Sequence, residues 1–464
     1  MKRCLVMSVR FYDHRYHGQF GDGEVEWPPA PFRLFQALLA GTGSFGGPTT
    51  EEKHALRWLE KQPPPLIRAP VPEGTGKLLL FVPANQADVA VNRQDRLTGK
   101  LARYAFFAPD SCPEVHYIWP LGEAQAPSSL FSLAQRLLAL GWGVDQASAH
   151  AQLMNEEALQ KLSGILWRPV GQGGLGPSYR VPTVGSLEDL LAAYETFRDR
   201  LPAPRHYRPP RPPRVFATCV YLPDTALPHR PFAVFRLPEG LAFRQENTAK
   251  VAAMVRGLAI KAAQQDGLPD AETFVAGHVQ GAVETPPRFS YAPLPSIGHP
   301  HADGLLRRIV VAEPLGGDGS RAQWAQWALH NAVLTDEEGN QLGRLRVLEA
   351  LDGVVRCYWG PSRSWSSVTP VILPGFDDRK PTKALKLLRE ALGHAGIPEK
   401  AVVDARLQKA PFWPSSSHPS RYFCPEYLRG LPRWHVQLVF SEPVLGPILV
   451  GAGRHVGLGL FAVS

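Results

Sequence analysis

The chain's most informative stretch is residues 445–461, LGPILVGAGRHVGLGLF. Its glycines, which allow positive φ and close backbone approach, surround an Arg–His pair. Successive N–H groups in such a turn can form a concave anion site. A dinucleotide-binding loop would need a helix directly after it, and a P-loop would need Gly-Lys-Ser or Gly-Lys-Thr; neither fits here. Two interpretations stay open: a tight turn in a β-sheet, or a backbone cradle for an anion.

Working back from this stretch, the C-terminal half repeats one pattern of predicted elements. The first set has strands at 215–222, 232–237 and 305–312, helices at 247–265 and 321–330, and a hairpin of strands 345–351 and 354–358. The second set has strands at 368–373, 401–407, 434–440 and 456–462 and a helix at 381–392. This pattern predicts an α+β fold with two tandem ferredoxin-like modules, each an antiparallel sheet with helices on one face.

The N-terminal half is also predicted to mix strands and helices, with a strand at 5–11 and a helix that Pro31 begins. Between the halves, residues 202–214 read PAPRHYRPPRPPR. Proline at this density favours a stiff, extended segment. We therefore expect an N-terminal domain at 1–201, a linker at 202–214 and a C-terminal domain at 215–464.

Composition narrows the class of protein. The formal net charge of +8 and pI of about 9.2 favour a polyanionic partner. The five cysteines are scattered without a C-x-x-C pair, which argues against a thiolate zinc site and suits reduced thiols in a cytoplasmic protein. The apolar part of the N-terminus is too short for a signal peptide, and no apolar run reaches the length of a membrane helix.

One proline-rich loop carries the densest group of chemically active side chains. His299, His301 and Asp303 fall within five residues, and Arg307 and Arg308 follow closely. A metal site would need further ligands that no motif supplies. Acid–base catalysis needs only one imidazole of near-neutral pKa beside a cation. A structural role in loop hydrogen bonding is the third interpretation.

Three further histidines are candidates. His418 lies in a serine-rich loop and is a second choice for catalysis. His435 lies in an alternating strand, a pattern typical of a packed histidine. His455, beside Arg454 in the glycine stretch, suits phosphate binding better than a role as a base. No motif for a protein nucleophile is present.

Basic side chains also follow a helical period. The helix at 381–392 would carry Lys383, Lys386 and Arg389 on one face, either as an RNA contact or as a solvated surface. Residues 88–103, with several arginines and lysines, are predicted to form a loop or arm with the same two interpretations.

Several of these motifs together resemble one protein family. Residues 9–11 (VRF), 16–18 (YHG), 27–38 (WPPAPFRLFQAL) and 55–60 (ALRWLE) resemble the start of the fused CRISPR subunit of type I-U (I-G) systems. Residues 293–304 (PLPSIGHPHADG) resemble its central motif, and residues 451–461 resemble the C-terminal glycine-rich loop of RAMP proteins. The resemblance spans nearly the whole chain, and it is carried by the ordered combination of motifs.

The resemblance implies a fusion of two functions. The N-terminal part would correspond to the Cascade subunit that holds the 5′ handle of CRISPR RNA, and the C-terminal part to the endoribonuclease that cuts repeat RNA. Such nucleases work without a metal or other cofactor: the RNA's own 2′-hydroxyl attacks the adjacent phosphate and leaves a 2′,3′-cyclic phosphate. The expected partners are CRISPR repeat RNA, the mature crRNA and other Cascade subunits, and no membrane.

We therefore expect a CRISPR RNA-processing endoribonuclease that is also an effector-complex subunit. The expected catalytic residues are His299, His301 and His418. The expected RNA-binding residues are Gly451, Gly453, Arg454, His455, Gly457, Gly459, Lys383, Lys386, Arg389, Arg307 and Arg308. The alternatives are a non-catalytic RNA-binding subunit and a metal-dependent nuclease.

Overall fold

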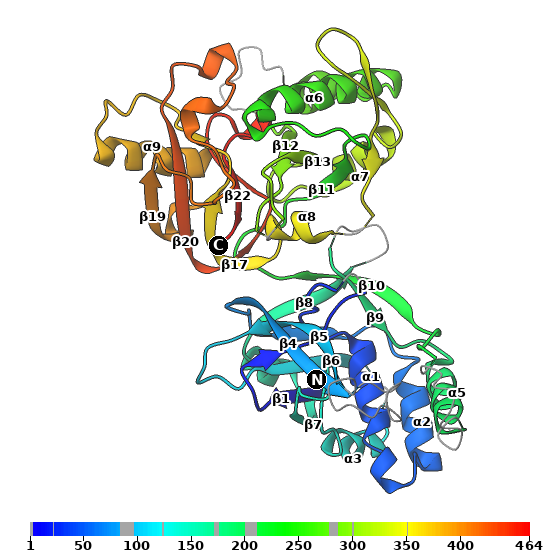
Figure 1. Cartoon of the computed structure of the whole chain (residues 1–464). Coiled ribbons are helices and arrows are strands. Elements are labelled where there is room, and N and C mark those ends of the chain that lie inside the picture. Colours follow the sequence, from blue (N-terminus) through cyan, green and yellow to red (C-terminus); the bar gives the residue numbers. More distant parts are fainter. Residues whose placement is uncertain are drawn as a thin grey trace. The chain divides into compact units, whose positions relative to one another are not determined.

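The computed structural model describes residues 3–21, 23–83, 97–122, 125–170, 176–199, 211–277, 286–298, 301–349 and 351–464. The chain forms two compact units, Met1–Asp224 and Thr225–Ser464. Both are α+β and built on antiparallel sheets (Figure 1).

A seven-stranded sheet is the centre of the first unit. Its order is β7 (Ala147–Met154), β1 (Arg3–Phe11), β6 (Glu114–Gly122), β3 (Leu66–Ala69), β8 (Ile165–Val170), β10 (Ala217–Pro223) and β9 (Ser178–Val181). Strand β1 is buried along nearly its whole length because it has a neighbour on both sides, as its continuous apolar sequence predicts. The sheet is therefore organised around the first strand of the chain.

The helices of this unit are α1 (Pro31–Ala40), α2 (Thr50–Leu59), α3 (Ser129–Gln135), α4 (Glu156–Gln160) and α5 (Ser186–Asp199). Pro31 occupies the first turn of α1, where its missing N–H costs nothing, and Phe32 and Phe35 are buried on its inner face. A capping box between Thr49 and Glu52 begins α2. Helix α3 packs on β7 and against α2, so these helices share one core with the sheet.

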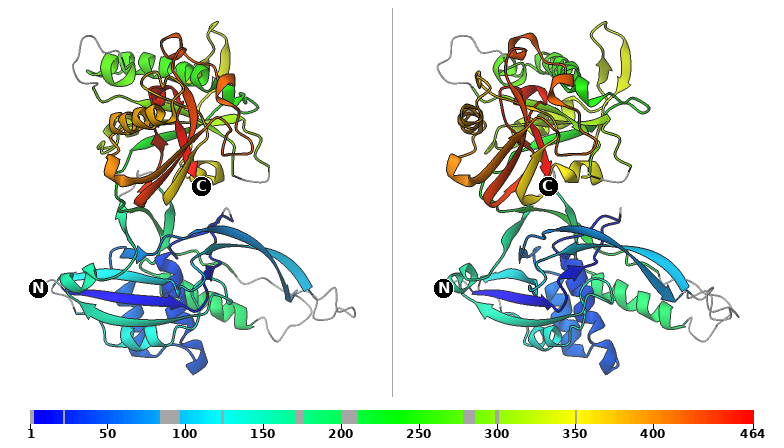
Figure 2. Two further views of the ribbon diagram at one scale, coloured as in Figure 1. Left: turned by 90° about the vertical axis from the view of Figure 1, so that its left-hand side faces the viewer. Right: turned by 60° about the vertical axis from the view of Figure 1, so that its left-hand side comes forward.

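A long hairpin leaves the body of the first unit (Figure 2). It consists of β4 (Gly74–Pro83) and β5 (Leu97–Phe106), with the short β2 (Arg15–Tyr16) beside β5. Part of the basic segment 88–103, predicted as a loop or arm, therefore belongs to a strand from residue 97 onward. Residues 88–96 of that segment lie outside the described residues.

The first sheet of the second unit has the order β12 (Ser290–Pro295), β13 (Leu306–Ala312), β11 (Phe232–Arg236) and β16 (Arg346–Val347). Helices α6 (Thr248–Gln265) and α7 (Ser320–Ala328) pack on it, and β14 (Val333–Thr335) with β15 (Gln341–Arg344) forms a hairpin beside α6. Buried Val251, Val255 and Ala259 give α6 the apolar face that its sequence predicts.

The second sheet of this unit has the order β18 (Val371–Ile372), β20 (Arg433–Leu445), β17 (Pro361–Ser367), β22 (Leu460–Val463) and β21 (Ile448–Leu449). Strand β19 (Val402–Gln408) also pairs with β20. Helix α9 (Pro381–His394) buries Leu388 and Leu392 against this sheet, whereas Leu385, predicted to face inward, is 36% exposed.

Two expectations about organisation need correction. The strand β10, expected to open the C-terminal domain, pairs with β8 and β9 of the first unit, so the division lies after Asp224. The expected hairpin partner at 354–358 is a short helix, α8 (Gly353–Cys357). Asp352 accepts hydrogen bonds from the backbone N–H groups of Val354 and Val355, and this N-cap favours a helical turn over a hairpin.

Candidate nucleic-acid interface

Two loops distant in sequence meet beside the start of α6. Residues 296–298 and 301–304 follow β12, and residues 411–421 precede β20. Gln245 Nε2 donates to the carbonyl of Ser415 at 2.5 Å, and Ser415 Oγ donates to the carbonyl of Ala302 at 3.2 Å. Gly304 has φ +71°, and a Cβ there would stand 2.6 Å from the Ser415 carbonyl oxygen, so the approach of the two loops requires glycine.

This contact brings together the loops that carry two of the predicted catalytic histidines. His301 and His418 are both exposed to solvent. His299, the third, lies outside the described residues. The sequence gives no sign of this pairing, because more than a hundred residues separate the loops.

The hydrogen bonds of His418 define what its ring can do. Its Nδ1 accepts from the backbone N–H of Ser420 at 3.3 Å and lies 2.8 Å from the Ser420 hydroxyl. In the neutral ring the proton is therefore on Nε2, the nitrogen that these bonds leave unused. His418 is thus arranged to donate a hydrogen bond to a ligand rather than to accept one.

A partly buried polar frame holds the second loop in place. Ser417 Oγ donates to Glu246 Oε1 at 2.6 Å. The backbone carbonyl of Ser417 lies 3.0 Å from Nε2 of the fully buried His435. On its other side His435 Nδ1 lies 3.3 Å from Ser367 Oγ. Burial lowers the pKa of His435, so this ring is neutral at neutral pH and acts as a packed histidine, as its strand position predicts.

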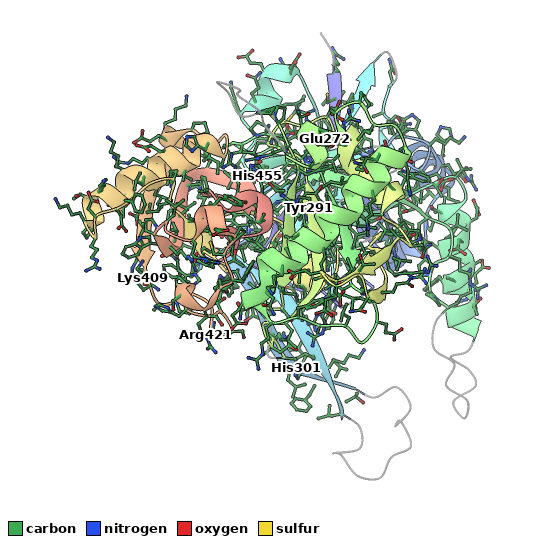
Figure 3. The ribbon with its side chains drawn as sticks, turned by 90° about the horizontal axis from the view of Figure 1, so that it is seen from above. Glu272, Tyr291, His301, Lys409, Arg421 and His455 are labelled. Carbon is green, nitrogen blue, oxygen red and sulfur yellow. The ribbon has the colours of Figure 1, made fainter. Side chains whose placement is uncertain are left out.

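Cations surround the same edge of the unit. Burial raises the pKa of Glu246, but the Ser417 hydrogen bond and the charges of Arg421 and Arg244 hold it below its usual value, so both arginines lie near it. Lys250 Nζ lies 5.0 Å above the ring of Phe423. Figure 3 shows His301 and Arg421 along one edge of this unit, apart from His455. Together these loops form what we call the histidine edge: His301, His418, Arg244, Lys250 and Arg421.

Arg307 and Arg308, predicted to bind RNA, are both engaged in ion pairs. Arg307 forms a double hydrogen bond to Asp303, with distances of 2.9 and 2.7 Å. Arg308 Nε lies 2.6 Å from Asp352 Oδ2. The hydrogen bond from Arg307 lowers the pKa of Asp303, which makes this carboxylate an ion-pair partner rather than a free ligand. A role of either arginine in RNA binding stays a prediction.

The predicted basic stripe lies on the outer face of α9. Lys386 and Arg389 are exposed and Lys383 is half-buried. Lys383 Nζ lies 2.7 Å from Asp378, and Arg389 Nε lies 3.2 Å from Glu399. These two charges are partly compensated, which leaves Lys386 as the residue that tests the stripe best.

The four glycines predicted as an RNA cradle have packing roles in the structure. Gly451, Gly457 and Gly459 have φ values of +102°, +78° and +83°, which favour glycine. A Cβ on Gly453 would stand 2.8 Å from the Cβ of Leu458. All four are buried, so the turn interpretation accounts for them, and contact of this loop with RNA stays a prediction.

His455 lies in a different environment from the histidine edge. Its Nδ1 lies 3.0 Å from the carbonyl of Phe289, before β12, and Figure 3 places it near Tyr291. Burial, with the charges of Arg454 and Arg288, lowers the pKa of His455 to about 2. Its Nε2 is therefore unprotonated near neutral pH.

Comparison with known proteins identifies the family. The family model described as "CRISPR-associated protein, GSU0054 family" matches residues 13–463. The chain belongs to this GSU0054 family of CRISPR-associated proteins. No curated protein matches it. One similar solved structure is titled "CRISPR associated protein Cas6"; the TM-score is 0.26 and the sequence identity 8%, over 51% of this chain and 98% of that one.

Two further observations characterise this GSU0054 family protein. Among the described residues, no group of three or more His, Cys, Asp or Glu side chains is placed to hold a metal ion. Of the helices that the structure describes, none is both long and apolar enough to cross a membrane.

Sequence reasoning missed most of the residues that support the histidine edge. Gln245, Glu246 and Arg421 stand alone in sequence, without a motif around them. Their role depends on contacts across about 170 residues, such as Ser417 to Glu246 with a separation of 171. The local signals for this site were the proline-rich loop that carries His301 and the Ser-rich loop around His418.

Proposed function

We propose that this CRISPR-associated protein is a metal-independent endoribonuclease that cuts CRISPR repeat RNA and then retains the crRNA within an effector complex. The observation that carries the proposal is the histidine edge: two exposed histidines on loops joined through Ser415, with Arg244 and Arg421 near Glu246 and Lys250 over Phe423. Imidazoles supply proton transfer near neutral pH, and cations stabilise the charge that develops on a phosphate.

The strand orders support tandem ferredoxin-like (RAMP) modules. Numbered along the chain as 1 to 4, the strands β11, β12, β13 and β16 lie in the order 2-3-1-4. The strands β17, β19, β20 and β22 have the same order. In the first unit, β1, β3, β6 and β7 repeat it once more. This is the order of a βαββαβ ferredoxin-like sheet, a fold that RNA-binding modules use.

The proposed reaction needs nothing beyond RNA and protein. The 2′-hydroxyl loses its proton as its oxygen bonds to the adjacent phosphorus, and the bond from phosphorus to the 5′-oxygen breaks. That oxygen takes up a proton, so the products carry a 2′,3′-cyclic phosphate and a 5′-hydroxyl. We place His301 or His299 as the base; the imidazolium that forms then supplies the proton to the 5′-oxygen. His418 donates a hydrogen bond from its Nε2–H to the phosphate.

The N-terminal unit would hold the 5′ handle of the crRNA and contact other effector subunits. Its part in this proposal rests on its α+β fold and on membership of a CRISPR-associated family.

The test is cleavage of repeat RNA by the full chain in EDTA. We expect a cyclic-phosphate product, and a rate about 10²- to 10⁴-fold lower in His418→Ala and in His301→Ala or His299→Ala. His150→Ala is the control, because His150 is exposed on β7 of the other unit. Tight binding of intact RNA would instead assign the protein as a non-catalytic subunit, and loss of cutting in EDTA would indicate a metal-dependent nuclease.

A further inference from the structure

Four basic side chains gather where β11 and β12 begin. Both strands pair with β13, and the first residue of each lies opposite Ala312. The segments that precede the two strands therefore reach the sheet at the same end, the edge where β11 and β12 begin. These segments carry Arg230 and Arg288. The glycine loop brings Arg454 and His455 to this edge, since it packs on β12. We call Arg230, Arg288, Arg454 and His455 the arginine cluster.

Within the described part of the chain, no carboxylate compensates the guanidinium groups of this cluster. Each donates one hydrogen bond to a carbonyl oxygen: Glu313 at 3.2 Å from Arg230, Gly277 at 3.0 Å from Arg288, and Gly451 at 3.2 Å from Arg454. Among the described residues, none of the three forms an ion pair with a carboxylate. Buried Nε atoms of Arg230 and Arg288 have no hydrogen-bond partner in the described chain.

The carboxylate of Glu313, whose backbone contacts Arg230, is already used. Glu313 offers Arg230 its backbone carbonyl, but its side-chain oxygens accept from the backbone N–H groups of Gly319 and Ala322 at 3.2 and 2.6 Å. That carboxylate therefore serves the start of α7 rather than the arginines. Arg230 remains a cation that is only 4% exposed.

His455 adds an acceptor to these donors. The Phe289 carbonyl can only accept, so Nδ1 of His455 carries the proton and donates at 3.0 Å. Its Nε2 is then a bare acceptor, buried and without a partner in the described part of the chain. Arg288, Arg454 and His455 are half-buried rather than fully enclosed.

The arginines of the cluster repel one another. Burial and the charge of Arg454 lower the pKa of Arg230 to about 10, and burial and the charge of Arg288 lower that of Arg454 to about 10. Arg256 of α6 adds a further cation near Arg288. Burying like charges without a counter-ion opposes folding, so this edge favours an anion strongly.

We propose that the arginine cluster binds a single phosphate group of the class that keeps an ionisable P–OH, namely inorganic phosphate or a terminal phosphate monoester. Guanidinium forks match phosphate oxygens, and the P–OH would donate to Nε2 of His455. An internal phosphodiester has no P–OH to donate. The phosphate site stands whether or not the protein cuts RNA; only the assignment of an RNA end as its source rests on the proposed function.

The first test compares anions at matched ionic strength and about pH 6.5, where a phosphate monoester keeps part of its second proton. For the full chain, potassium phosphate should raise the melting temperature by a few degrees over potassium chloride, and more than potassium sulfate does. Equal melting temperatures in phosphate and chloride would overturn the site. An equal rise in melting temperature in sulfate would refute the role of His455 as the acceptor of a hydrogen bond from the P–OH.

Variants separate ligand binding from structure. Arg454→Met should raise the melting temperature in chloride, because it removes an uncompensated charge, and should abolish the gain from phosphate. His455→Phe should remove only the preference for phosphate over sulfate. Arg363→Met is the control, since Arg363 is an exposed residue paired with Glu442 at 3.1 Å. A stabilising effect of phosphate that survives in Arg454→Met and Arg288→Met would refute the proposal.

A third arm identifies the source of the phosphate. Short RNA oligonucleotides with a 5′-phosphate, a 3′-phosphate or neither are bound to the intact protein, with inorganic phosphate as competitor. An advantage for one phosphorylated end that Arg454→Met abolishes assigns the site to that RNA end. No advantage, with the phosphate effect intact, assigns it to free phosphate. Absence of RNA cleavage leaves the melting measurements unchanged, so the two proposals fail separately.

Discussion

At Gly457 the backbone has φ +78°, and two other elements close around the place of a side chain. A Cβ there would stand 2.7 Å from Thr248 Cγ2 on α6 and 2.8 Å from Pro293 Cδ on β12. We expect Gly457→Ala to lower the free energy of unfolding by at least about 2 kcal/mol, because it adds backbone strain to a steric clash. Urea unfolding measures the change.

Gly393→Ala is the matched control for that prediction. Gly393 is exposed within α9, and a Cβ there would meet nothing within 4 Å. Alanine should stabilise that helix by about 0.5–1 kcal/mol. Equal effects of the two substitutions would show that the glycine loop tolerates side chains and that its packing is not specific.

His229 makes stability depend on pH. Burial lowers its pKa to about 4, and its Nε2 has no partner among the described residues. Protonation then favours the unfolded chain, whose histidine titrates near pH 6.5, so stability is full above about pH 6.5 and falls as the pH drops towards 4. In His229→Gln we expect the loss of unfolding free energy between pH 7 and pH 5 to be smaller by about 1–2 kcal/mol.

Urea titrations at the two pH values measure this difference. His150→Gln serves as the control because His150 is exposed. An unchanged pH dependence in His229→Gln would place the acid sensitivity of the protein elsewhere.

At the scale of elements, α9 shows how a charged face divides into paired and unpaired residues. Lys383 and Arg389 pair with Asp378 and Glu399, whereas Lys386 is exposed between them. If the stripe binds RNA, Lys386→Glu should weaken binding of repeat RNA and reduce the slope of log K against log salt by about 1. Lys400→Glu, an exposed charge just beyond α9, is the control. An unchanged slope would make the stripe a solvated face.

Helices with a strong apolar period were predictable from the sequence. The prediction of 247–265 is confirmed by α6 at Thr248–Gln265, and that of 381–392 by α9 at Pro381–His394. The prediction of a hairpin at 345–358 was wrong, because Asp352 caps a helical turn there. The apolar run that follows Asp352 is too short for its periodicity to distinguish a helix from a strand. The periodicity of apolar residues thus predicted the long helices α6 and α9, whereas a side-chain cap determines the short helix α8.

The candidate site was predictable only in part. A proline-bound loop with two histidines and a serine-rich loop with a third were visible as unusual local composition. Their contact through Ser415, and the partly buried frame of Ser417, Glu246 and His435, depend on how the sheets bring distant segments together. Arg230 and Arg288 are isolated in the sequence and gave no signal there. They become neighbours only because β11 and β12 begin at the same end of the sheet.

For the whole molecule, one strand order appears in three sheets that share no obvious sequence repeat. The three copies differ in what is added to the sheet. The first unit inserts the β4–β5 hairpin between its second and third strands, and the last sheet has β21 and the glycine loop where a second helix would stand. The domain boundary followed from strand pairing rather than from the proline-rich segment, because β10 completes the first sheet.

The glycine loop has a consequence for how this protein can be rebuilt. Val456 and Leu458 of the loop and Ile372 of β18 belong to the same buried cluster as Val251 and Val255 of α6. The last sheet therefore completes the core of its neighbour within the second unit. A chimaera that exchanges one of these two sheets for that of a relative must import the loop and the surface of α6 that receives it as a single cassette.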